Sequence, residues 1–387
     1  MAPNIEAIQE AICQEKLDGW LFSSFRRRDR LSEEILELPG NLTNTRPWFY
    51  AVPARGSPVK IVHAIEASHL DTLPGEKRVY VSREELLACL AVLAGKRWGV
   101  HVSDSIFAIS YLDAGTAANL ERAGLVLCSA APLIQRFKGL LDEKGIESHE
   151  KAAGDLYAIV DETWALVKKS HASGTPLFEG DMRNAMLAGM EKRGIAADHP
   201  PIAAAGAHSG DPHFDFLGRG SEVREGDVIQ FDLWAKEKKE GSIYADISWL
   251  GVYGKKAAPD IEKAFQDLVL AREGAYEFIK NELAAGRRPT GAMVDQRTRE
   301  ILIKAGYEKA IKHRTGHGID TEGHGSGVNI DSVEFTDTRL LLDGSCFSLE
   351  PGIYFESFGL RTEIDVYIQG GKAVVSGGER QFSLLTC

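Results

Sequence analysis

The chain has 387 residues, of which 44% are hydrophobic and 26% are charged, and these proportions are typical of a folded globular protein. Its 45 basic and 56 acidic side chains give a formal net charge of −11, which argues against a surface that binds nucleic acid. At about 100–200 residues per domain, the length predicts two domains.

The cysteines and the N-terminus indicate a reducing compartment. Five cysteines are scattered along the chain, their number is odd and none forms a CxxC pair, so we expect no disulfide framework. The N-terminus lacks an apolar signal segment, and no apolar run approaches the roughly 18 residues of a membrane span. We therefore expect a cytoplasmic protein with neither a membrane nor a nucleic-acid partner.

The first third of the chain alternates the signals of strands and helices. Three short apolar segments are expected to form strands: Trp20–Phe22, Val59–Ala64 and Trp98–Val102. A helix is expected from about Arg83 to Ala94, because Ser82 can cap its start, Glu85 completes a capping box and Gly95 can end it. This alternation predicts an α/β domain.

The rest of the chain combines long helices with strands. Apolar residues recur at helical spacing from about Ser148 to Ser170, which predicts a long amphipathic helix. Further helices are expected over residues 180–192, 260–285 and 291–305. We place the domain boundary just before the long helix, giving an α/β domain of residues 1–145 and an α+β domain of residues 146–387.

Two acidic residues are predicted to face each other across a hairpin. Residues 228–235 and 242–253 have the pattern of strands and flank a charged turn that ends in glycine. If the hairpin is centred on Lys239, one face is wholly apolar and becomes the core side, which fixes the register. The same register places Asp232 directly opposite Asp246. Like charges directly opposite each other on paired strands are destabilising, so these two carboxylates need a cation.

A second hairpin repeats this arrangement near the C-terminus. Residues 347–355 and 360–367 flank another turn, and pairing their apolar residues sets Glu350 against Glu363. Pro351 is expected to distort the ladder locally, since proline cannot donate a ladder hydrogen bond. The sequence therefore predicts two register-matched pairs of acids on two hairpins.

One histidine completes the candidate site. His317 lies between Gly316 and Gly318, and glycines permit the close backbone approach that a crowded site requires. Carboxylates and an imidazole without thiolates suit Mn²⁺, Co²⁺, Fe²⁺ or Zn²⁺. A single acid on a strand is usually a surface residue, so the prediction depends on the paired acids together with the histidine.

At these residues the chain resembles the methionine aminopeptidase, prolidase and creatinase family, whose catalytic domain has the pita-bread fold. The resemblance covers about residues 147–368, and the first third resembles, more weakly, the N-terminal domain of creatinase and prolidase. It implies an α+β pita-bread catalytic domain preceded by a smaller α/β domain. Matching the family's motifs places its five metal ligands on Asp232, Asp246, His317, Glu350 and Glu363.

The resemblance also implies a role for each ligand. Asp246 and Glu363 would bridge two divalent ions, with Mn²⁺ favoured, while Asp232 completes one site and His317 with Glu350 completes the other. Bound ions make water more acidic, so a hydroxide would attack the scissile carbonyl. Glu350 would then shuttle a proton to the leaving nitrogen.

Further residues match the family's substrate site. The segment Gly206–His213 resembles its Pro-His motif and points to His213, while His324 matches a second histidine seven residues past the Gly-His-Gly motif. Both are expected to bind substrate and stabilise the oxyanion, although each alone would be interpreted as a loop residue. His208 is a further substrate-binding candidate. Arg361 is expected to support Glu350 or Glu363.

The chain departs from the family pattern at several positions. Asp232 and Asp246 are farther apart in the sequence than is usual in the family. Gly325 follows His324 where the family has glutamate after the histidine, and Ser248-Trp249 replaces Thr-Arg. We expect these changes to leave the metal ligands in place but to alter the wall of the substrate pocket.

Three functions are therefore considered. The first is hydrolysis of short peptides by an Xaa-Pro dipeptidase or aminopeptidase, with a homodimer implied by the resemblance. The second is a metal-dependent hydrolase or lyase that acts on a non-peptide substrate. The third is a metal-free relative, either a creatinase-like amidinohydrolase or a binding module, which the intact ligands argue against.

His313 is expected at the surface rather than in the site.

Overall fold

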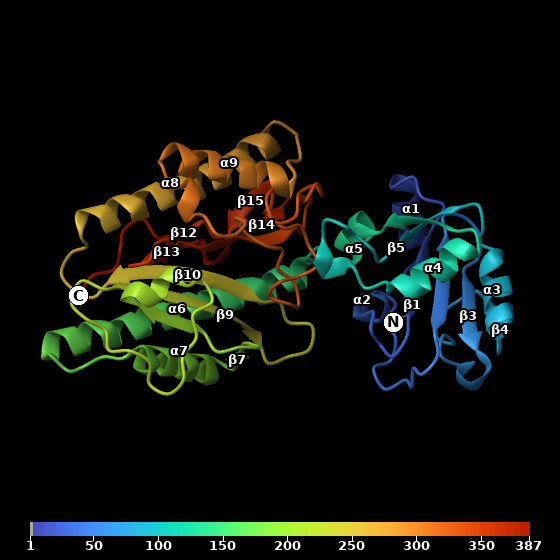
Figure 1. Ribbon diagram of the computed structural model, residues 1–387, viewed down its shortest axis with the longest axis horizontal. Helices are drawn as coiled ribbons and strands as arrows, with labels where there is room; N and C mark the ends of the chain where they lie inside the picture. The colour runs from blue at the N-terminus through green and yellow to red at the C-terminus, as the bar shows by residue number, and fades with distance from the viewer. Residues whose placement is uncertain (1–2) are drawn as a thin grey trace. The chain divides into compact units, whose positions relative to one another are not determined.

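The computed structural model describes residues 3–387, and the chain divides into two compact units after Lys138 (Figure 1). The predicted boundary, after residue 145, is therefore too late, because it falls inside helix α6 (Glu143–Ser173). The segment just before α6 already belongs to the second unit, because the Leu141 N–H donates to the Gly344 carbonyl at 2.8 Å.

The first unit is a six-stranded sheet with helices on both faces. Its strand order is β4-β3-β2-β1-β5-β6, and β1 runs antiparallel to β2 but parallel to β5. The strands are β1 (Gly19–Ser24), β2 (Trp48–Pro53), β3 (Val59–His63), β4 (Glu76–Tyr80), β5 (Arg97–Val100) and β6 (Val126–Ser129). The three predicted strands are thus confirmed as β1, β3 and β5.

Alternating side chains on β1 separate two cores in this unit. Trp20 and Phe22 pack with α1 (Ile5–Gln14), α2 (Arg30–Ile35) and α5 (Ala131–Lys138). Leu21 points to the other face, towards α3 (Arg83–Ala91) and α4 (Ala114–Arg122). This is the two-residue period expected of a strand that is buried on both faces.

The predicted helix at residue 83 is confirmed as α3, and its capping box is present. The Glu85 N–H donates to the Ser82 hydroxyl at 3.1 Å, while the Ser82 N–H donates to the Glu85 carboxylate at 3.2 Å. The helix ends at Ala91, three residues before the predicted end.

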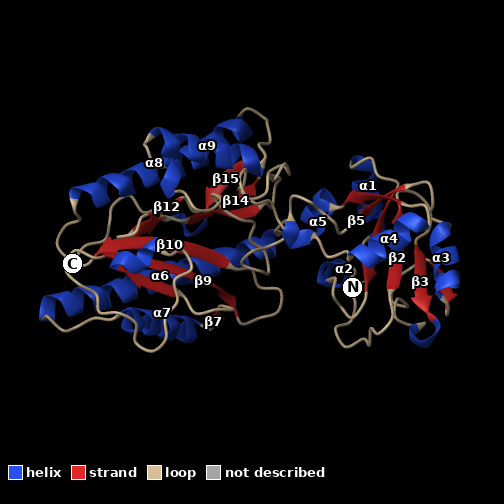
Figure 2. Ribbon diagram, viewed as in Figure 1, coloured by secondary structure: helices blue, strands red, loops and turns tan. Residues whose placement is uncertain are grey.

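In the second unit, helices flank the strands on two sides (Figure 2). Helices α6 and α7 (Glu179–Arg193) pack against β9 and β10, while α8 (Pro259–Ala284) and α9 (Gly291–Lys304) cover the strands near the C-terminus. These strands are β7 (Ile195–Ala196), β8 (Ile202–Ala205), β9 (Val228–Glu237), β10 (Ala245–Val252), β11 (Cys346–Leu349), β12 (Gly352–Tyr354), β13 (Gly359–Arg361), β14 (Ile364–Gln369) and β15 (Lys372–Val375). Across residues 3–387, no helix combines the length and hydropathy needed to cross a membrane.

The predicted register of the first hairpin is wrong by two residues. Asp232 on β9 pairs with Ser248, and Asp246 on β10 pairs with Trp234, so the two aspartates are not directly opposite. The turn is displaced because Tyr244 does not join the ladder, and its N–H donates to the Asp320 carbonyl at 3.0 Å. A shift of two residues keeps every side chain on its predicted face, so both aspartates still share one face.

The predicted register of the second hairpin is confirmed on both sides of an interruption. The β11–β14 ladder ends at Leu349 opposite Ile364, and the β12–β13 ladder resumes at Gly352 opposite Arg361. Between them the Glu350 N–H donates to the Thr315 carbonyl at 2.7 Å instead of entering a ladder. The distortion expected at the proline is therefore present.

Candidate metal centre

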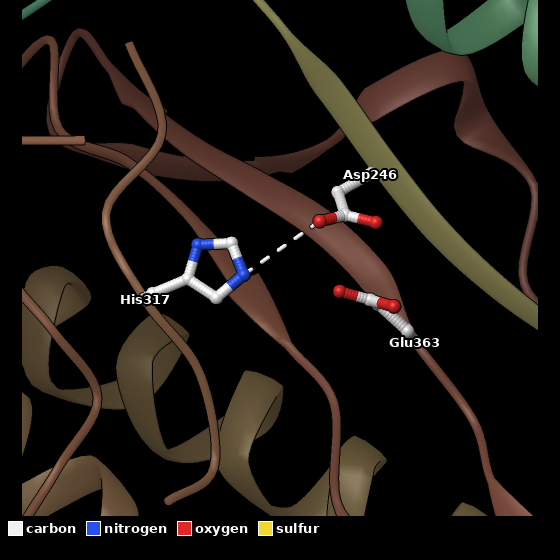
Figure 3. Close-up of side chains that lie close together, drawn as sticks. All are labelled: Asp246, His317 and Glu363. Carbon is white, nitrogen blue, oxygen red and sulfur yellow. Dashed lines mark ion pairs between the residues drawn. The ribbon is translucent and has the colours of Figure 1, made fainter. Parts of the chain in front are cut away.

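Three of the predicted ligand residues converge in the second unit (Figure 3). Asp246 comes from β10, His317 from an extended segment before β11, and Glu363 from the segment between β13 and β14. One ligand atom from each residue lies within 4.8 Å of the other two, and all three side chains are buried. The His317 Nε2 atom is 3.6 Å from the Asp246 Oδ2 atom.

The other two predicted ligands lie beside this trio. The Glu350 Oε1 atom is 3.4 Å from His317 Nε2. Asp232 is linked through one hydroxyl: the Ser248 Oγ atom lies 2.9 Å from Asp232 Oδ1 and 2.8 Å from Glu363 Oε2. All five residues therefore surround one region, while their role as ligands stays a prediction.

Arg361 contacts Glu350, one of the two acids that we expected, but it contacts Asp232 more directly. Its guanidinium forms an ion pair with Asp232, and its Nε atom donates to the Ser248 hydroxyl at 3.0 Å. The distance from Nε to Glu350 Oε2 is longer, at 3.9 Å. Arg361 therefore holds Asp232 most directly and the glutamates only from farther away.

The buried carboxylates raise one another's affinity for protons. Burial raises the pKa of Asp246 well above its usual value, and the Asp232 carboxylate raises it further. Burial likewise raises the pKa of Glu363, with Asp246 adding to the effect. Burial and the neighbouring His324 lower the pKa of His317, which favours the neutral imidazole that binds metals.

The orphaned oxygens of this cluster fit a cation. Asp246 Oδ1 and Glu363 Oε1 are buried and have no hydrogen-bond partner among the described residues. Buried polar atoms in folded proteins are nearly always satisfied, so such a pair requires an explanation. A divalent ion would satisfy both oxygens and offset the repulsion between the acids. The oxygen and nitrogen donors suit a hard or borderline ion.

Glycines let the backbone segments of the site pack closely, as expected. A Cβ atom at Gly316 would overlap the Ser348 carbonyl oxygen. A Cβ atom at Gly318 would lie 2.7 Å from the Gly327 carbonyl carbon. The segment that carries His317 is therefore held against both neighbours only because no side chain intervenes.

The three predicted substrate histidines have different surroundings. The His324 ring lies 4.2 Å from the His317 ring. Partial desolvation of its ring lowers the pKa of His324, and Arg314 and His213 add to the effect, although part of the side chain still reaches solvent. His213 and His324 are exposed. His208 instead stacks on Phe214 with ring centroids 4.1 Å apart.

His208 also has a buried partner. Its Nδ1 atom lies 2.8 Å from Glu179 Oε1, and the same carboxylate accepts N–H bonds from Ala205 and Ser221. Glu179 is fully buried at the start of α7. This carboxylate therefore ties together the two ends of the loop that carries His213.

Two expectations about individual side chains were wrong. Trp249 does not line a substrate pocket, because it lies on the core face of β10 and packs edge-on against Tyr157. His313 is half-buried rather than a free surface residue, and its Nε2 atom lies 2.8 Å from the Tyr354 hydroxyl. That hydroxyl accepts from Arg361 Nη1 at 3.5 Å, which connects His313 to the ion pair with Asp232.

Comparison with known proteins identifies the family. Residues 149–370, more than half of the chain, match metallopeptidase family M24. The chain therefore belongs to that family and is a metallopeptidase.

Individual relatives and a solved structure agree with this assignment. The chain is 26% identical over 334 residues to the probable dipeptidase PepE of Mycobacterium tuberculosis, covering 84% of this chain and 81% of the relative. It is 32% identical over 164 residues to the Xaa-Pro dipeptidase of Lactobacillus helveticus, covering 42% of this chain and 40% of that one. The crystal structure of dipeptidase PepE from Mycobacterium ulcerans superposes with a TM-score of 0.70 at 22% identity, covering 99% of this chain and 96% of that chain. The predicted two-domain pita-bread architecture is thus confirmed.

Substituting Gly316 by alanine should destabilise the protein by about 1–3 kcal/mol, because the added Cβ atom overlaps a backbone oxygen that cannot move aside freely. Gly323 is a matched control, since a Cβ atom there would lie 3.9 Å from Trp234, an ordinary contact. Gly323→Ala should change stability by less than about 1 kcal/mol. Urea unfolding measures both values, and equal effects would contradict the close approach.

Replacing His313 by glutamine should make stability less sensitive to acid. Burial, with Arg361, lowers the pKa of His313 to about 4. The unfolded chain, with a pKa near 6.5, takes up the proton first, so stability is complete above that pH and is lost as the pH falls towards 4.

Between pH 7 and pH 5, the wild type should lose about 1–2 kcal/mol more stability than His313→Gln. Unfolding in urea at both pH values gives this difference, and the remaining histidines cancel because both proteins contain them. Parallel pH profiles would show that His313 is protonated with equal ease in the folded and unfolded states.

Proposed function

We propose that the chain hydrolyses the peptide bond of short peptides with two divalent metal ions, and that Xaa-Pro dipeptides are its preferred substrates. The observation that supports this most strongly is the convergence of buried Asp246, His317 and Glu363, with two carboxylate oxygens that have no partner among the described residues. The names of the relatives, a probable dipeptidase and an Xaa-Pro dipeptidase, support the substrate class.

The residues proposed to hold the ions are Asp232, Asp246, His317, Glu350 and Glu363. Two such ions, with Mn²⁺ favoured over Co²⁺, Fe²⁺ and Zn²⁺, would supply Lewis acidity and lower the pKa of water. Arg361 supports this set by pairing with Asp232 and donating to Ser248. We further propose that the enzyme is a cytoplasmic homodimer.

Glu350 is proposed as the residue that moves the proton. Burial raises the pKa of its carboxyl group above the usual value, which favours a group that can both accept and return a proton. Its Oε1 atom accepts a hydrogen bond from the Ser348 hydroxyl at 3.2 Å, which orients the carboxylate. The proton would pass from the attacking water to the nitrogen that leaves.

The histidines are proposed to act on the substrate. His324 and His213 are exposed near the centre and would donate hydrogen bonds to the substrate carbonyl as negative charge develops on its oxygen. His208 is proposed to bind substrate as well, although its Nδ1 atom is already engaged by Glu179. Its other ring nitrogen is the atom that would reach substrate.

Activity should require both the metal and the trio of ligands. Protein stripped by a chelator should hydrolyse Xaa-Pro dipeptides only after Mn²⁺ or Co²⁺ is restored. Asp246→Asn and Glu363→Gln should each reduce kcat/KM by at least about 100-fold, since even residues that only support ligands contribute about 10–100-fold. Glu240→Gln, at the exposed hairpin tip, is the control and should retain wild-type kcat/KM.

The same assay separates the alternatives. Metal-loaded protein that cleaves no member of a panel of Xaa-Pro and Xaa-Ala dipeptides would favour a hydrolase or lyase of a non-peptide substrate. Full turnover after complete removal of metal would reject the proposed metal dependence and favour a creatinase-like reaction.

A further inference from the structure

A second group of buried polar side chains lies behind the candidate centre and has no part in the proposed hydrolysis. It comprises His149 on α6, Cys346 on β11, Asp365 on β14 and Ser376. His149 and Asp365 are fully buried. Burying a histidine or an aspartate side chain is unfavourable unless the side chain is hydrogen-bonded, so the partners of these two residues explain why they are buried.

Asp365 binds the backbone of a candidate ligand. Its Oδ2 atom accepts a hydrogen bond from the Asp246 N–H at 2.7 Å. The backbone of Asp365 pairs with Ser348 in the β11–β14 ladder, so it is the side chain that reaches across to β10. Two residues earlier, the Glu363 N–H donates to the Ser248 carbonyl at 3.3 Å. These two bonds join β10 to the segment that carries Glu363.

His149 fixes the residue just before β10 from the helix side. Its Nδ1 atom lies 2.6 Å from the Tyr244 carbonyl oxygen. A carbonyl oxygen can only accept, so Nδ1 carries the proton. Nε2 of the neutral ring then accepts from the Ser376 hydroxyl at 2.6 Å. The carbonyl of residue 244 and the N–H of residue 246 are thus both held by side chains from outside the hairpin.

We propose that Asp365 and His149 are positioning residues that hold Asp246 in the orientation needed to bind metal. This inference rests on the proposed metal dependence. Without the Asp365 carboxylate, the buried Asp246 N–H would lose its acceptor, and the backbone would shift to find another. Ligand groups must be held to within about 0.5 Å of the productive geometry, so even a small shift weakens binding.

The test measures Mn²⁺ affinity by calorimetric titration of the full chain after removal of metal. Asp365→Ala should weaken Mn²⁺ binding by about 10–100-fold, as the loss of other supporting residues does. Asp365→Asn should stay within about 3-fold of wild type, because its amide oxygen can still accept from Asp246. The amide oxygen then occupies the position of Oδ2, and the amide nitrogen takes the place of Oδ1, which has no hydrogen-bond partner among the described residues.

Asp331 provides a matched control. It is fully buried and accepts N–H bonds from Val333, Glu334 and Phe335 rather than from a candidate ligand. Asp331→Ala should lower the melting temperature and leave Mn²⁺ affinity unchanged. If Asp365→Ala does not fold, His149→Leu carries the test, with an expected 3–10-fold loss of affinity from the freed Tyr244 carbonyl.

The outcomes distinguish a failure of this inference from a failure of the proposed function. Equal losses in Asp365→Asn and Asp365→Ala would overturn it, because charge rather than position would then explain the effect. Wild-type affinity in folded Asp365→Ala, or in His149→Leu where that variant carries the test, would also overturn it while leaving the proposed function intact. A wild-type chain that binds no Mn²⁺ would reject both.

Discussion

The site depends on the repulsion among carboxylates that the fold buries together. Asp246 and Glu363 lie among further acids, and Arg361, which pairs with Asp232, is the guanidinium in direct contact with the cluster in residues 3–387. Burying ionised groups without partners is unfavourable, so the surrounding strands must hold them by other interactions. The packed cores on both sides of the sheets supply that stability.

The sequence predicted faces more reliably than it predicted pairing. Alternation along β9 and β10 correctly placed Asp232 and Asp246 on one face, because side-chain direction follows a period of two. A slip of two residues preserves that pattern, so periodicity alone could not reveal that Asp232 pairs with Ser248. The turn decided the register, and its geometry depends on Tyr244 binding outside the hairpin. The second hairpin has a shorter turn, and its register was predicted correctly.

Contacts between distant segments explain most of what the sequence did not predict. Nothing in the local pattern near His313 indicates that Tyr354 lies 2.8 Å away, and nothing near Asp365 indicates that it accepts from Asp246. Trp249 shows the opposite error: the resemblance suggested a pocket residue, whereas strand alternation places it in the core. Motifs identified which residues gather, and tertiary packing determined how each is supported.

The residues proposed to hold metal and those proposed to bind substrate lie on different kinds of segment in the second unit. Asp246 lies on a strand, Glu363 lies between two strands, and His317 is clamped between backbone segments, so their positions are set by sheet geometry. His213 and His324 lie in exposed loops, where substitutions disturb the core least. Departures such as Gly325 occur in these loops, so they can change which bond is presented without changing the ligands. We therefore expect members of the family that act on different substrates to differ in these loops, and to keep the acids that the sheets position.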